Sequence, residues 1–162
     1  MANKKVTAER GKFKQEIHAA LYNCDELRNL IVGDTTGMTK SEIRKAFKDR
    51  VKSHLFIDDT IEETDSYIFY DVVFPTLRAN IKTCQVVLYA VCHRDILDTY
   101  SNEKFPGNRA DALAQMVEDC LLNDKEVANS FGIGELSLDS VDLYNSRKYY
   151  GCYMQFSVPN FR

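Results

Sequence analysis

The sequence lacks a long hydrophobic run, and its longest nearly unbroken apolar stretch extends only from Val86 to Cys92. A membrane-spanning helix needs about 20 predominantly apolar residues. The N-terminus also lacks the apolar segment of a signal peptide, because Thr, Glu, Arg and Lys residues follow the first lysines. We therefore expect neither a membrane protein nor an exported one.

Neither sign of charge is in large excess, and the net charge of the 162 residues is −3. The field of the whole protein therefore neither attracts nor repels nucleic acid strongly. Hydrophobic residues make up 44% and charged residues 28% of the chain, which excludes global disorder. The length predicts a single domain over residues 1–162.

Paired cysteines of the Cys-x-x-Cys type, which indicate zinc or redox sites, are missing. The five cysteines are widely spaced, and each has apolar neighbours. We interpret them as small buried thiols in a reducing compartment. They are Cys24, Cys84, Cys92, Cys120 and Cys152.

Two N-terminal helices are predicted from the spacing of apolar residues. From Ala8 to Val32 these residues recur every three or four positions, and Gly33 ends the pattern. Thr39 and Glu42 then form a capping box, which begins a second helix that runs to about His54.

Four strands and one further helix are predicted for the rest of the chain. The helix is capped by Asn108 and runs to Leu122. The predicted strands are Ser66 to Phe74, Ile81 to His93, Glu135 to Leu143 and Tyr149 to Val158. Pro75 closes the first strand, and the second is the central strand of the sheet. The last two strands are expected to pair in antiparallel fashion, with a bulge near Ser140. The fold class is α+β in the order ααββαββ, with one helix packed on a mostly antiparallel four-stranded sheet.

Catalytic chemistry has one candidate, because Cys92 and His93 provide a nucleophile and a base next to each other. Adjacent side chains of a strand point to opposite faces of the sheet, so these two are not expected to hydrogen-bond. Gly132 and Gly134 precede a strand and do not open a helix, which is not the context of a phosphate-binding loop. We predict no enzyme, no catalytic residue, no metal and no cofactor.

A resemblance to a known group of proteins rests on four segments of the second half of the chain. These are residues 86–95, 107–114, 131–138 and 149–156, which read VVLYAVCHRD, GNRADALA, FGIGELSL and YYGCYMQF. Their order, with a central strand ending in His-Arg-Asp, resembles the neck and tail-terminator proteins of tailed bacteriophages. The resemblance covers about 64–159, and residues 1–55 are interpreted as a helical N-terminal extension.

The resemblance implies a structural virion protein at the phage neck, assembled in the host cytoplasm. Such proteins usually form a sixfold ring of their own copies that terminates the tail tube and joins it to the head. The implied partners are further copies, the tail tube protein and head-side connector proteins, with passing contact to genomic DNA and none to a membrane. The nine Tyr and nine Phe residues fit either subunit interfaces or an aromatic-rich core. The alternative is a small adaptor that binds nucleic acid or protein through its basic N-terminal helices.

Two charged segments are the predicted subunit interface. One is a basic stripe on the second helix and the other is an acidic loop before the first strand. The residues are Arg44, Lys48, Lys52, Asp58, Asp59, Glu62, Glu63 and Asp65. We expect the segments to lie at different places on the surface, so that they meet across neighbouring subunits; a calcium loop, specific DNA reading and ordinary solvated faces are the alternatives.

Overall fold

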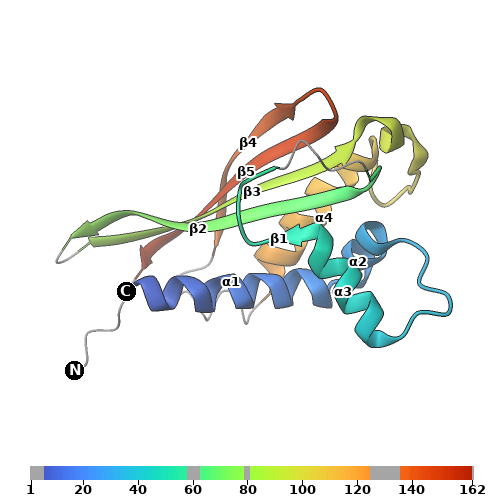
Figure 1. Ribbon diagram of the computed structural model, residues 1–162. Helices are drawn as coiled ribbons and strands as arrows, with labels where there is room; N and C mark the ends of the chain where they lie inside the picture. The colour runs from blue at the N-terminus through green and yellow to red at the C-terminus, as the bar shows by residue number, and fades with distance from the viewer. Residues whose placement is uncertain (1–5, 58–62, 79–80, 125–135, 162) are drawn as a thin grey trace.

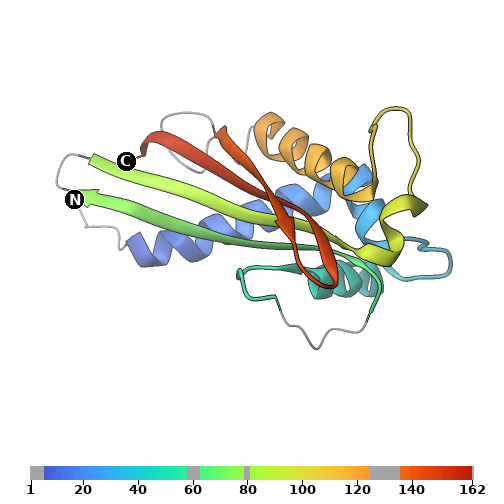
Figure 2. The same ribbon diagram turned by 90° about the horizontal axis from the view of Figure 1, so that it is seen from above.

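The computed structural model describes residues 6–57, 63–78, 81–124 and 136–161. Helices cover one face of a single twisted sheet, whose strands follow the order β1-β2-β3-β5-β4 (Figures 1 and 2). The elements are α1 (Val6–Asn23), α2 (Asp25–Val32), α3 (Lys40–Arg50), β1 (Val51–Lys52), β2 (Ser66–Arg78), β3 (Ile81–His93), the 3-10 helix η1 (Arg94–Thr99), α4 (Arg109–Asn123), β4 (Ser137–Asn145) and β5 (Tyr149–Phe161). The predicted α+β class and the central position of β3 are confirmed.

The sheet has five strands and is mixed, so the predicted four antiparallel strands miss one. The extra strand is β1, which pairs in parallel with β2 through Val51 and Ile68. The second predicted helix was extended to His54, whereas α3 ends at Arg50 and the chain continues directly into β1. A segment of two residues is too short to show a periodic pattern in the sequence, so β1 is recognised as a strand only by its pairing with β2.

The first predicted helix is interrupted at Cys24, so α1 and α2 are separate elements. Cys24 has extended backbone angles, with φ at −82° and ψ at 104°. The Arg28 guanidinium donates a hydrogen bond to the carbonyl of Tyr22 at 2.8 Å across this break. The apolar stripe continues through the break because both helices contribute to one core, so the spacing predicted one helix where there are two.

Both strands that contain a proline are longer than predicted. β2 passes Pro75 with a register shift between Val73 and Thr76, and β5 extends beyond Pro159. Proline cannot donate to the ladder, but it is tolerated where a strand has a free edge. Among the described strands both prolines satisfy this condition, because β1 pairs with β2 only near Ile68 and β4 pairs with β5 only as far as Ser157.

The N-terminal helices are part of the main hydrophobic core. Buried side chains of α1, α2 and α3 join those of α4 and of the inner sheet face in one cluster. Asp71 of β2 fixes α1 to the sheet through ion pairs with Arg10 and Lys14, at 2.5 and 2.9 Å. Burial acts to raise the pKa of Asp71, but the hydrogen bonds from Lys14 and from the amide of Val72 outweigh it and hold this pKa below its usual value.

The predicted helix after Asn108 is confirmed as α4, together with its packing on the central strand. The Asn108 side chain accepts a hydrogen bond from the amide of Asp111, and the Asp111 carboxylate accepts one from the amide of Asn108. Leu113 and Val117 are fully buried in the core cluster that also contains Leu88 of β3. Local capping and periodicity therefore determined this element.

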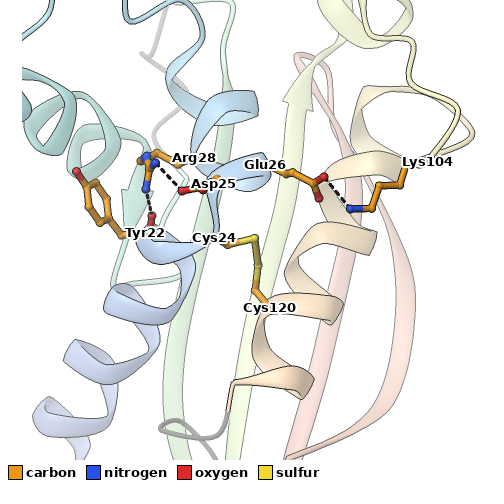
Figure 3. Close-up of a disulfide and its surroundings, with 7 residues drawn as sticks. All are labelled: Tyr22, Cys24, Asp25, Glu26, Arg28, Lys104 and Cys120. Atoms are coloured by element: carbon orange, nitrogen blue, oxygen red, sulfur yellow. Dashed lines mark hydrogen bonds and ion pairs between the residues drawn. A yellow bond between two sulfur atoms is a disulfide. The ribbon is translucent and has the colours of Figure 1, made fainter.

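Cys24 and Cys120 form a disulfide, so the prediction of five free thiols was wrong for two of them. The bond joins the α1–α2 break to the end of α4, and the two Cα atoms are 6.3 Å apart (Figure 3). The cysteines are 96 positions apart, and only helix packing brings them together. Cys84, Cys92 and Cys152 are free. The cysteines therefore no longer support an assignment to a reducing compartment.

Reduction of this disulfide is expected to lower the free energy of unfolding by about 2 to 4 kcal/mol, because a long loop is released in the unfolded chain. Urea unfolding with and without reductant measures the loss. In the Cys120→Ser variant, which has already lost the bond, reductant should have no further effect. A wild-type protein that unfolds at the same urea concentration with and without reductant would contradict this expectation.

The outer sheet face, opposite the helices, carries a second aromatic cluster. Its buried members are Tyr67, Phe69, Val91 and Tyr149. Further along this face, the Tyr89 ring lies 4.9 Å from that of Tyr144 and 4.8 Å from that of Tyr153, measured between centroids. Most aromatic side chains of the described residues are thus used within the subunit, and Phe56 is the large exception at 70% exposure.

Candidate functional site

Cys92 and His93 lie on opposite faces of β3, as the strand periodicity predicts. Cys92 belongs to the core and contacts the Ser66 hydroxyl at 3.2 Å, whereas His93 packs against Tyr149 on the outer face. Burial raises the pKa of the Cys92 thiol to about 11, so the thiol is protonated at neutral pH. His93 Nδ1 accepts a hydrogen bond from the amide of Asp95 and caps η1. The two side chains are therefore not placed to hydrogen-bond to each other.

A recess of about 740 Å³, here called the α1–α3 groove, separates α1 from α3. Arg44 and Lys48 of the predicted basic stripe line one side, and Lys14 and His18 of α1 line the other. Among the described residues that line the groove there is no Asp or Glu. The lining also contains apolar and aromatic side chains, which are Ala19, Tyr22, Val51 and Tyr70, and uncharged polar ones, which are Gln15, Asn23 and Ser53.

The positive charge of the α1–α3 groove comes from Arg44 and Lys48. Lys14 is already paired with Asp71 and donates a hydrogen bond to the carbonyl of Ser53. Burial, with a smaller effect of the Lys48 charge, lowers the pKa of His18. Arg44 and Lys48 are exposed and form no ion pair with a described residue. The groove is therefore suited to an anionic partner that also has apolar surface.

A second recess, here called the β1 pocket, lies on the other side of α3 and has a volume of about 500 Å³. Lys52 and the exposed Phe56 line it together with Glu63 and Asp65. Asp65 forms an ion pair with Arg50 at 3.1 Å. Three further residues of the predicted acidic loop lie outside the described residues; they are Asp58, Asp59 and Glu62.

The predicted separation of the basic stripe from the acidic loop is therefore wrong in one respect. Arg44 and Lys48 line the groove, but Lys52 shares the β1 pocket with Glu63 and Asp65. The reason is that the helix ends at Arg50, so a four-residue helical spacing no longer applies at Lys52. The described part of the acidic loop meets its basic neighbours within one subunit.

The edge strand β4 is a surface that the sequence analysis missed. Its Val141 and Leu143 side chains are 50% and 66% exposed. They pair with Met154 and Cys152 of β5 and so belong to the helix-side face of the sheet. β4 is the last strand, far from α1 and α3 (Figure 1). The signal available in the sequence was Asp139 and Asp142, because charges within a strand are typical of sheet edges.

Two other classes of site find no support in the part of the chain that the structure describes. No group of three or more His, Cys, Asp or Glu side chains there is placed to hold a metal ion. The helices there also lack the combination of length and apolar character that crossing a bilayer requires.

Comparison with known families gives a match to the family described as YomW, over residues 15–158. The chain belongs to the YomW family. The family name is that of a phage-derived gene, which agrees with a phage-related protein and carries nothing specific to a neck or a tail terminator. No curated protein matches the chain.

The YomW match includes the second half of α1 and the whole of α2, α3 and α4, in addition to the sheet up to Val158 of β5. It therefore extends well beyond the segment 64–159, on which the resemblance to tail terminators rests. The stretch that matches the YomW family contains His18, Arg44 and Lys48 of the α1–α3 groove and the edge strand β4. Both surfaces thus lie within the matched stretch, apart from Gly11 and Lys14 of the groove.

Proposed function

We propose that this chain is a structural subunit of a tailed-phage particle, which forms a ring at the neck that ends the tail tube and joins it to the head. Its partners are further copies, the tail tube protein and the head-side connector proteins. Its place is the virion, after assembly in the host cytoplasm, and it performs no catalysis. The phage-derived family name supports the phage part of this proposal.

The observation that carries the ring is that the described residues leave two different features uncovered at opposite ends of the strand order. The β1 end has the α1–α3 groove and the β1 pocket beside it. The β4 end is an open edge strand with exposed Val141 and Leu143. Contacts between two different patches repeat from copy to copy and close into a ring when the rotation permits.

The disulfide also fits a virion, which meets an oxidising environment after release.

The ring is tested by light scattering after size-exclusion chromatography, followed by electron microscopy of negatively stained protein. We expect a mass that is a multiple of the 18.6 kDa subunit and ring-shaped particles, formed alone or on purified tail tubes. A protein that stays monomeric at all concentrations and does not bind tail tubes would contradict the proposal.

The second candidate function is an adaptor that binds nucleic acid or protein through the N-terminal helices. The specific observation in its favour is the α1–α3 groove, whose described lining has exposed Arg44 and Lys48 and no carboxylate. When a protein binds DNA through its phosphates, the logarithm of the binding constant falls linearly with the logarithm of the salt concentration. A titration of labelled DNA at several salt concentrations therefore distinguishes this function from the ring.

A further inference from the structure

We propose that β4 of one copy docks into the α1–α3 groove of the next copy, and this inference rests on the ring proposed above. The strand offers two exposed aliphatic side chains, Val141 and Leu143. Their register opposite Met154 and Cys152 places both on the same face of β4. A patch of this kind on the surface of a soluble subunit is suited to burial against a partner.

The charge of β4 determines which partner it suits. Asp139 and Asp142 are exposed and form no ion pair with a described residue. The strand contains no Lys or Arg. A second β4 paired with it edge to edge would bring acidic strands together, and like charges on adjacent strands destabilise the pairing. The partner of β4 is therefore a basic surface, not a second β4.

The α1–α3 groove provides the complementary surface. Arg44 and Lys48 stand on its rim without a carboxylate among the described lining residues, while Ala19 and Val51 provide apolar lining. Its volume of about 740 Å³ exceeds that of two aliphatic side chains many times. Leu143 and Val141 of the incoming strand would fill apolar space, while Asp142 on the other face of the strand and Asp139 at the register shift would meet the cations of the rim.

The positions of the two surfaces explain why the contact joins different copies. β4 is the last strand of the sheet, whereas the groove is lined by Val51 of β1 and Tyr70 of β2, at the other end of the strand order. Each copy thus has one acidic strand and one basic groove, and every contact uses one of each. Such a contact is heterologous and repeats in one direction, as ring closure requires. Burial of the aliphatic side chains provides affinity, and the charges set the register and the rate of association.

Charge reversal tests this contact in the full-length protein. One variant carries Asp139→Lys with Asp142→Lys, and the other carries Arg44→Glu with Lys48→Glu. Each alone is expected to weaken self-association at least about tenfold, because like charges then face each other. An equimolar mixture is expected to restore assembly, since each reversed surface finds a complementary one on the other variant. Analytical ultracentrifugation measures both, and circular dichroism establishes that the variants are folded.

The matched control is Lys40→Glu with Lys45→Glu, which makes the same change on exposed positions of α3 outside both recesses. It should assemble like the wild type.

If the wild type forms rings and both reversed variants do too, the β4 contact is overturned while the ring stands. If each variant fails and the mixture also fails, the pairing is overturned. If the groove variant loses only DNA binding, the groove is a nucleic-acid site and the inference is wrong. A wild type that never assembles overturns the ring itself.

Discussion

Replacement of Gly151 by alanine is expected to lower the free energy of unfolding by about 3 kcal/mol or more, because there is no space for a β-carbon. Gly151 pairs with Val91 of β3 and with Tyr144 of β4, in the middle of the sheet. An added Cβ would overlap the carbonyl oxygen of Ala90 and lie 2.8 Å from the Cα of Val91. Both are backbone atoms of the central strand, so no side-chain rotation relieves the overlap.

The matched control for Gly151→Ala is the same substitution at Gly11. Gly11 is inside helix α1, and a Cβ added there has no atom within 4 Å apart from its chain neighbours and the backbone of its own helix. Alanine there should raise the free energy of unfolding by about 0.5 to 1 kcal/mol. Urea unfolding followed by circular dichroism measures both variants. If Gly151→Ala unfolds at the wild-type urea concentration, the close approach of β3 and β5 at this position is wrong.

The second large effect is expected for Leu113→Ala, with a loss of about 2 to 5 kcal/mol, because the change leaves a cavity in the core. Leu113 has no exposed surface and lies where α4 packs on the inner face of the sheet. The exposed Leu143 is the matched control, and Leu143→Ala should change the stability of the monomer by no more than about 0.5 kcal/mol. The same urea titration compares them. A loss below about 1 kcal/mol for Leu113→Ala would mean that its packing differs from the one described.

The candidate site was predicted only in part from the sequence. The exposed positions of Arg44 and Lys48 followed from helical periodicity, because the four-residue spacing places both on one flank of α3, beside the apolar side that contains the buried Phe47. The groove that these two residues line requires α1 to lie beside α3, and no local pattern contains that information. Lys52 was assigned to the same stripe because the end of α3 is decided by the pairing of β1 with β2.

The sequence by itself determined the elements whose signals are local. The capping boxes at Thr39 and Asn108 begin α3 and α4 as predicted, and the register of the β4–β5 hairpin shifts between Leu138 and Ser140, where a bulge was expected. Capping, periodicity and alternation act between residues a few positions apart, so one stretch of chain contains the whole interaction.

Only the tertiary structure decided the features that depend on distant parts of the chain. The Cys24–Cys120 bond and the break between α1 and α2 arise where two helices meet, and β1 is a strand only because β2 lies beside it. Val141 and Leu143 show the same limit, because alternation predicts which side of a strand is apolar but not whether a helix covers it. The exposed edge of β4 exists because the helices pack on the middle of the sheet, and that arrangement is set by the core as a whole.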